Sequence, residues 1–219
     1  MPLTLPRAIL FDLDGTLADT APDLAAAVNQ LRAARGLAPA PYELLRPFAS
    51  SGARGLIGAA FGLKPEDGGY EELRIGFLEN YAAALAVESR LFDGIQGLLD
   101  GLRESGLTWG IVTNKAARFT DLLVPQIGLH QADCVISGDT TPYPKPHPAP
   151  LLEAARRLAL APQECWYVGD DLRDIQAGVA AGMPTIAATW GYCGDAEPIG
   201  WGADALANTP MHLLNMIRG

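Results

Sequence analysis

The sequence predicts an α/β fold built on a doubly wound parallel sheet, and three observations lead to this prediction. Five short runs are almost continuously apolar, as expected of strands buried on both faces of a parallel sheet. Helical patterns separate the later runs, and polar residues directly follow several of them. The expected strands cover residues 8–11, 109–112, 134–136, 165–168 and 185–188.

The segments between the later strands carry helical periodicity. The expected helices cover residues 95–105, 119–127, 148–160 and 172–181. Strands and helices that alternate at this spacing favour a Rossmann-like sheet covered by helices. Because ligands of such open sheets bind beyond the carboxyl ends of the strands, the polar residues at those ends are the first candidates for a functional site.

The region after the first strand differs in character. Residues 19–92 contain no strand-like run, and helical patterning covers residues 22–35, 42–48, 52–61 and 70–87. Pro22 and Pro41 suit the first turn of a helix, and Gly36 suits a helix end. We therefore expect an α-helical cap domain, residues 19–92, inserted into an α/β core that comprises residues 1–18 and 93–219.

The 219-residue chain is acidic, with a formal net charge of −9 and a sequence pI near 4.7. Nucleic acid and anionic membrane surfaces are disfavoured as partners, because both require clustered Lys and Arg. The hydrophobic content of 49% is ordinary for a folded protein and too high for a disordered one.

The three cysteines, Cys134, Cys165 and Cys193, form no CxxC pair and are odd in number, which favours free thiols in a reducing compartment. One basic residue, Arg7, and four apolar residues precede Asp12, a stretch too short for a signal peptide. We expect a cytoplasmic protein, and the sequence leaves both a monomer and a homodimer open.

The strongest local signal is the segment FDLDGTL. Asp12 ends a buried strand, Asp14 follows two residues later, and Gly15 allows a sharp turn that aims both carboxylates at one point. Two neighbouring carboxylates repel each other and are costly to bury, so we expect a divalent cation beside them. An ordinary Asp-Gly turn is the alternative for this segment taken alone. A calcium loop of the EF-hand type fits poorly, because Leu17 stands where that loop needs glycine.

A second acidic group, GDDLRD, follows the fourth strand and contains Asp170, Asp171 and Asp174. Acidic residues also cap helix N-termini, which explains one or two of the three. Together with Asp12 and Asp14, the group indicates a site for a hard cation. Oxygen ligands without a His/Cys cluster point to Mg²⁺. Helix capping remains an equal alternative for Asp171 and Asp174.

Two further pieces complete a candidate phosphate site. Thr113 and Asn114 end the second expected strand, where a hydroxyl and free backbone N–H groups can hold phosphate oxygens. Lys145 lies on a proline-stiffened loop. Taken singly, Thr113 is a common strand-end hydroxyl and Lys145 a common surface charge, but beside the acids they indicate phosphate binding.

This combination suggests phosphoryl transfer through an aspartyl phosphate. Asp12 is the expected nucleophile, because a carboxylate nucleophile divides one difficult step into two. Asp14 is the expected acid and base, protonating the leaving alkoxide and then deprotonating the attacking water. Mg²⁺ held by Asp12, the Asp14 carbonyl and Asp170 would act with Lys145 to offset the charge of carboxylate and phosphate together.

These residues resemble the four motifs of the haloacid dehalogenase superfamily. The motifs are DxDGT from Asp12, then Thr113, then Lys145, then GDDxxxD around Asp170, with a helical cap inserted after the first. The resemblance covers essentially the whole chain. It implies Mg²⁺-dependent hydrolysis of a small phosphomonoester.

The resemblance also implies a role for each motif residue: Asp12 as nucleophile, Asp14 as acid and base, Thr113 on the phosphate, Lys145 on the phosphoaspartate and Asp170 on the metal. The chain departs from the pattern at residue 171, an aspartate in place of the serine of many members. We place that aspartate, together with the one at residue 174, behind the metal ligands.

Within the superfamily the chain looks similar to the phosphoglycolate phosphatases, most clearly in residues 12–20, 109–115 and 169–183. The resemblance places substrate specificity in the cap, where the loop that contains Gly52 and Arg54 is the best candidate. Arg54 suits a bidentate grip on a substrate carboxylate, and an exposed cation at a helix N-terminus is the equal alternative.

Residues 52–54 and 191–204 also look similar to N-acetylmuramic acid 6-phosphate phosphatases, whose bulkier substrate likewise carries a carboxylate. We therefore expect a small phosphorylated metabolite that bears a carboxylate. The first candidate is 2-phosphoglycolate and the second is N-acetylmuramic acid 6-phosphate.

Three other classes of protein remain as alternatives. A sugar phosphomutase shares every motif but returns the phosphate to its substrate. A phosphoacceptor signalling module of the receiver type also uses acids, a hydroxyl residue and a lysine around Mg²⁺, but it is about half this length and needs no cap. Dehalogenation is disfavoured, because it needs neither Asp14 nor the metal.

Overall fold

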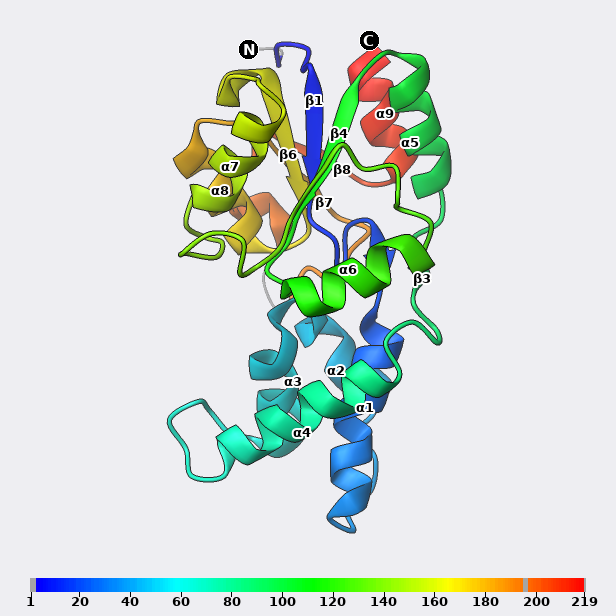
Figure 1. The fold of residues 1–219 in the computed structure, drawn as a ribbon, viewed down its shortest axis with the longest axis vertical. Coiled ribbons are helices and arrows are strands. Elements are labelled where there is room, and N and C mark those ends of the chain that lie inside the picture. The colour runs from blue at the N-terminus through cyan, green and yellow to red at the C-terminus, as the bar shows by residue number, and fades with distance from the viewer. Residues whose placement is uncertain (1–2, 195–196, 219) are drawn as a thin grey trace.

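The computed structural model, which describes residues 3–194 and 197–218, contains a six-stranded parallel sheet in the order β5-β4-β1-β6-β7-β8 (Figure 1). The finding confirms the predicted doubly wound α/β fold. The order of the strands reverses at β1, so the carboxyl end of β1 lies at the switch point where open α/β sheets bind ligands. The strands are β1 Ala8–Phe11, β4 Thr108–Val112, β5 Cys134–Ile136, β6 Cys165–Gly169, β7 Thr185–Ala188 and β8 Ala205–Ala207.

Each face of the sheet packs against its own pair of helices, since successive strand residues point to opposite faces. Ile9 and Phe11 face α5 (Ile95–Glu104) and α9 (Pro210–Arg218), whereas Ala8 and Leu10 face α7 (Ala149–Arg157) and α8 (Leu172–Ala181). Both faces of β1 are therefore fully buried, which explains its uninterrupted apolar sequence.

The helices of residues 21–83 lie together beyond the carboxyl end of β1, at the opposite end of the molecule from both termini (Figure 1). Between them and the sheet lies α6, Ala117–Gln126. The chain enters and leaves this helical region through β2 (Ala18–Asp19) and β3 (Arg90–Leu91), which pair antiparallel. The helices are α1 Ala21–Ala34, α2 Tyr42–Leu45, a 3-10 helix Arg46–Ser51, α3 Gly52–Phe61 and α4 Tyr70–Ala83.

Several elements differ from the expectations. The strands β2, β3 and β8 and the helix α9 were not expected, and each of the three strands has only two or three residues. The helix expected over residues 42–48 is one α-helical turn followed by the 3-10 helix. The helix expected to reach residue 87 ends at Ala83. The backbone N–H groups of residues 87–89 instead donate to the buried carboxylate of Asp23, and the Ser89 hydroxyl does so at 2.6 Å.

Two further 3-10 helices, Pro162–Glu164 and Pro198–Gly200, complete the elements. None of the helices within residues 3–194 and 197–218 combines the length and the apolar character that a membrane span requires.

Candidate active site

The first acidic pair lies at the end of β1, as its position in the sequence predicts. The Asp12 N–H donates to the carbonyl of Val168 at 2.9 Å, so the sheet itself fixes this backbone. Gly15 follows with φ +91°, a conformation that favours glycine. A Cβ atom on Gly15 would overlap the Asp170 carboxylate, so the turn also makes room for the second acidic group.

Lys145 lies in the middle of the site with its side chain buried. Its Nζ lies 2.9 Å from Asp12 Oδ1 and 2.7 Å from Asp174 Oδ1, and it donates to the Tyr167 hydroxyl and the Val112 carbonyl at 2.8 and 3.0 Å. Burial alone lowers the pKa of this ammonium, but the two carboxylates raise it above its usual value. Lys145 is therefore a fixed positive charge beside Asp12.

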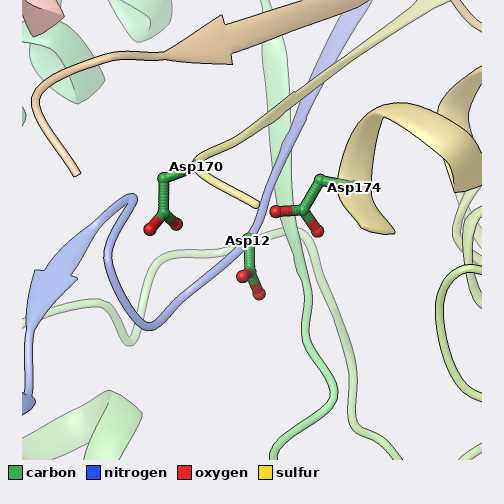
Figure 2. Close-up of side chains that lie close together, drawn as sticks. All are labelled: Asp12, Asp170 and Asp174. Carbon is green, nitrogen blue, oxygen red and sulfur yellow. The ribbon is translucent and has the colours of Figure 1, made fainter. Parts of the chain in front are cut away.

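Three buried carboxylates gather at the ends of β1 and β6 and the start of α8 (Figure 2). Asp12, Asp170 and Asp174 each offer an oxygen, and these oxygens all lie within 4.8 Å of one another. Burial, and to a lesser extent the neighbouring aspartates, raise the pKa of Asp12 to about 7 against the opposing effect of Lys145. Burial, Asp12 and Asp174 likewise raise the pKa of Asp170 well above its ordinary value.

This donor set fits a divalent cation. Asp12 Oδ1 is buried and finds no hydrogen-bond donor of acceptable geometry among the described residues, although it is ion-paired with Lys145. The site holds four buried carboxylates and two buried or nearly buried ammonium groups, so two negative charges are without compensation when all four carboxylates are ionised. The carboxylates are Asp12, Asp14, Asp170 and Asp174, and the ammonium groups are Lys115 and Lys145. The cluster Asp12, Asp170 and Asp174 can hold a metal ion.

Asp170 is positioned by groups from three parts of the chain. The Thr16 hydroxyl donates to its Oδ1 at 2.8 Å, and the Tyr192 N–H donates to its Oδ2 at 3.0 Å. The Ser50 hydroxyl lies 3.0 Å from the Asp14 carbonyl and 3.2 Å from Asp170 Oδ2. Ser50 belongs to the helical region of residues 21–83, so this region reaches the acidic cluster directly.

The Asp14 side chain points to a different set of partners. The Thr20 hydroxyl lies 2.5 Å from its Oδ1, and Lys115 Nζ lies 3.0 Å from the same oxygen. The Lys115 ammonium also lies 4.6 Å from the centre of the Tyr81 ring of α4. Asp14 is therefore held apart from the three clustered carboxylates.

The two polar residues after β4 occupy different places. Thr113 lines the cavity described below, and its hydroxyl oxygen accepts the Lys115 N–H at 3.1 Å. The Asn114 side chain bonds the backbone of Lys145 twice, accepting from its N–H and donating to its carbonyl at 2.9 Å each. Asn114 thus positions the loop that carries Lys145, whereas the sequence suggested a phosphate contact.

Asp171 and Asp174 cap the N-terminus of α8, the alternative that the sequence left open. The Asp171 carboxylate accepts the Arg173 N–H at 2.9 Å, and the Asp174 carboxylate accepts the Asp171 N–H at 3.1 Å. Asp171 is also ion-paired with the Arg173 guanidinium at 2.7 Å. Asp174 has a second role because its other oxygen contacts Lys145.

A cavity of about 350 Å³ lies over these groups, between the sheet end and the helical region. Its floor includes Asp12, Asp14, Thr113 and Lys145, and its far wall includes Phe77, Leu78 and Tyr81 of α4. Arg74 of α4 and Arg118 of α6 also line it. A buried polar floor under a partly apolar roof is the usual form of a small-molecule site.

The two residues expected to set specificity lie in different places. Gly52 lines the cavity, as does Ala53. Arg54 lines a separate hollow with Phe48 and Arg173, so its placement disagrees with a grip on a ligand in the main cavity. The reason is helical geometry, because each residue of α3 is rotated by about 100° from the one before.

Sequence reasoning missed several residues of the site. Lys115 directly follows Thr113 and Asn114, and its place after a buried strand was a usable signal. The contacts of Thr16, Ser50 and Tyr192 with Asp170 join residues 154, 120 and 22 positions apart, and no local pattern marks them.

Comparisons with known proteins agree with this geometry. The family model described as haloacid dehalogenase-like hydrolase matches residues 9–188. A phosphoglycolate phosphatase of Xanthomonas campestris is 47% identical over 213 residues, which is 96% of each chain. An N-acetylmuramic acid 6-phosphate phosphatase of Pseudomonas putida is 43% identical, again over 96% of each chain.

A solved structure described as a predicted phosphoglycolate phosphatase from Haemophilus somnus superposes with a TM-score of 0.85 at 27% identity. The match covers 97% of this chain and 98% of that chain. The similarity therefore includes the sheet and the helical region together.

Proposed function

This chain belongs to the haloacid dehalogenase-like hydrolase family, and from that membership we propose that it is a phosphatase that hydrolyses a small phosphomonoester through an aspartyl phosphate. The observation that carries the proposal is the setting of Asp12. Asp12 is 6% exposed and lies at the floor of the cavity, beside the Lys145 ammonium and the other clustered carboxylates.

Asp12 acts as the nucleophile. Its carboxylate oxygen forms a bond to phosphorus while the bond from phosphorus to the substrate alkoxide breaks. Lys145 stabilises the ionised carboxylate and then the negative charge of the phosphoaspartate. The Thr113 hydroxyl, which lines the same cavity, is placed to donate to a phosphate oxygen.

Asp14 acts as the acid and then the base. It protonates the leaving alkoxide in the first step and accepts a proton from water in the second. In that second step the water oxygen forms a bond to phosphorus while the bond from phosphorus to Asp12 breaks, which releases inorganic phosphate and restores the Asp12 carboxylate. Thr20 and Lys115 hold its carboxylate in place through the contacts at 2.5 and 3.0 Å. A fixed orientation matters because proton transfer requires hydrogen-bond distance to the reacting oxygen.

Mg²⁺ is the proposed cofactor, held by Asp12, Asp170 and the Asp14 carbonyl. When bound, it offsets the two uncompensated negative charges of the site and the charge of the phosphate. Asp174 is the third member of the acidic cluster, but its contacts with Lys145 and the Asp171 N–H favour a positioning role.

The proposed substrate carries a carboxylate besides its phosphate. The phosphoglycolate phosphatase at 47% identity supports 2-phosphoglycolate as the first candidate. The relative at 43% identity supports N-acetylmuramic acid 6-phosphate as the second. The cavity volume of about 350 Å³ supports keeping this bulkier sugar phosphate as a candidate. Pockets that enclose drug-sized ligands have volumes of about 300–1,000 Å³, and the cavity lies within this range.

Phosphate release from both substrates and a sugar-phosphate panel, with Mg²⁺ or with EDTA, tests the proposal. We expect release with Mg²⁺, loss of release in EDTA and recovery when Mg²⁺ is restored. Full activity in EDTA would contradict the metal role. Transfer of the phosphate back to the sugar would indicate a phosphomutase, and a stable phosphoaspartate without release would indicate a signalling module.

A further inference from the structure

We propose that Arg118 binds the second anionic group of the substrate, a carboxylate remote from the phosphate, and thereby sets substrate preference. This inference rests on the proposed phosphatase function, and it assigns the carboxylate to the core helix α6.

Among the described residues, all but one of the cations that line the cavity form ion pairs with acidic side chains. Within residues 3–194 and 197–218, five Lys or Arg side chains line the cavity, and four of them form ion pairs. The pairs are Lys145 with Asp12 and Asp174, Lys115 with Asp14, Arg173 with Asp171, and Arg74 with Glu71.

Arg118 is the exception. Its guanidinium makes no ion pair and no side-chain hydrogen bond with any residue in the described part of the chain, although acidic residues outnumber basic ones by 25 to 16. It stacks instead over the ring of its neighbour Phe119, with its central carbon 4.6 Å from the ring centre. Stacking on one face leaves the in-plane N–H donors of a guanidinium available to an anion.

The Arg118 side chain rests on a well-packed aromatic residue. Phe119 is buried and packs against Tyr81 of α4, with the ring centres 5.3 Å apart. Arg118 itself lies in the first turn of α6, Ala117–Gln126. A guanidinium that rests on a buried ring at the start of a helix loses less freedom on binding than one on a mobile loop.

The position of Arg118 matches a group at the far end of a substrate from its phosphate. Asp12 is buried at the floor of the cavity, whereas Arg118 is exposed and also lines an adjoining hollow of about 240 Å³ on α4. Arg74 and Leu78 line both spaces as well. A ligand that spans from Asp12 to Arg118 therefore crosses the apolar roof and ends near solvent.

The chemistry of the guanidinium selects a carboxylate at this end. Its planar fork donates two parallel hydrogen bonds to the two oxygens of a carboxylate, which a hydroxyl group cannot accept in the same way. A substrate that carries the carboxylate therefore gains an interaction that its analogue without the anion cannot make, and this difference sets the preference in kcat/KM.

Two matched pairs of probes separate the carboxylate from the rest of the substrate. N-acetylmuramic acid 6-phosphate and N-acetylglucosamine 6-phosphate differ by the lactyl carboxylate, and 2-phosphoglycolate and 2-hydroxyethyl phosphate differ at the carboxylate itself. We expect the wild-type enzyme to prefer the carboxylate-bearing member of at least one pair in kcat/KM.

In that pair, Arg118→Ala should lower the preference by about tenfold or more, chiefly through KM, and Arg118→Lys should give an intermediate value. The matched control is Arg156→Ala, an exposed arginine on α7 that does not line the cavity, and it should keep the preference within about twofold. Thermal unfolding of each variant checks that the fold is retained.

Other results overturn the inference. It fails if the wild type shows no preference in either pair, if Arg118→Ala keeps the preference, or if Arg54→Ala abolishes it and Arg118→Ala does not. Calorimetry with the same probes and the Asp12→Asn variant measures the ratio of binding affinities within each pair, and this ratio gives the preference without turnover. A wild-type protein that releases no phosphate thus refutes the proposed function, while the binding ratio still decides the role of Arg118.

Discussion

Lys115 Nζ lies 3.0 Å from Asp14 Oδ1, and this ion pair joins the loop after β4 to the turn after β1. Both side chains are nearly buried, and the Tyr81 ring of α4 lies against the ammonium. The residue proposed as acid and base is therefore positioned by a core lysine that in turn contacts the helical region of residues 21–83. The buried carboxylate depends on this partner for its charge balance.

Lys115→Met should reduce kcat at least about tenfold, because it leaves the Asp14 carboxylate without its cation and free to reorient. KM for p-nitrophenyl phosphate should change less than kcat, since Lys145 and Thr113 are untouched. Steady-state kinetics measure both, and Lys115→Arg should restore part of kcat. Lys64→Met is the control, because Lys64 is exposed. An equal effect of the two methionine variants would contradict the positioning role.

Asp12→Asn should abolish turnover and retain the fold, because the amide keeps the shape of the carboxylate and loses its nucleophilic charge. Phosphate release and circular dichroism measure the two outcomes. Activity comparable to wild type in this variant would refute the aspartyl-phosphate mechanism.

The metal-free protein should lose stability as the pH rises from about 4 to about 7. In this range the folded state keeps a proton on Asp12, whose pKa is raised to about 7 chiefly by burial, while the unfolded chain has released it. The folded state thus binds more protons, and the free energy of unfolding falls with rising pH.

Urea unfolding in EDTA at several pH values measures this slope. Mg²⁺ should flatten it by favouring the ionised carboxylates, and Asp12→Asn should reduce it. A free energy of unfolding that rises across the same window in EDTA would show that the buried carboxylates are compensated without a metal.

Tyr192→Phe should destabilise the protein by about 1–3 kcal/mol and lower kcat. The Tyr192 hydroxyl accepts the N–H groups of Thr20 and Ala21 at 2.8 and 2.9 Å and lies 3.0 Å from the Asp19 carboxylate. Its loss leaves buried donors without a partner and loosens Thr20, which holds Asp14. Urea unfolding and kinetics measure the effects, and Tyr143→Phe, at an exposed tyrosine, should be silent in both.

The thiols of Cys134, Cys165 and Cys193 should react slowly with iodoacetamide at pH 8 in the folded protein. Burial raises the pKa of each to about 11, so almost no thiolate is present. Mass spectrometry after timed alkylation measures the rate, with the urea-unfolded protein as the reference. Rapid labelling of Cys134 and Cys165 without urea would contradict their burial.

Much of this protein was predictable from local sequence. The parallel sheet follows from strands apolar on both faces, since burial on both sides leaves no place for alternating polar residues. Asp12, Asp14 and Gly15 are close in the chain, and so are Asp170 and Asp174, so one turn and one helix start decide where their side chains point. The sequence also specified that these two segments meet, because both follow buried parallel strands, whose carboxyl ends share one edge of the sheet.

The sequence indicated Lys145 as the cation beside the acids, but only the tertiary structure decided the places of Lys115 and Arg118. Lys115 reaches Asp14 across 101 positions of sequence, and Arg118 rather than Arg54 lines the main cavity. The helical rotation of α3 and the docking of α4 over α6 set these relations. Such contacts depend on how whole helices and strands pack against one another. The residues next to either partner in the sequence do not indicate this packing.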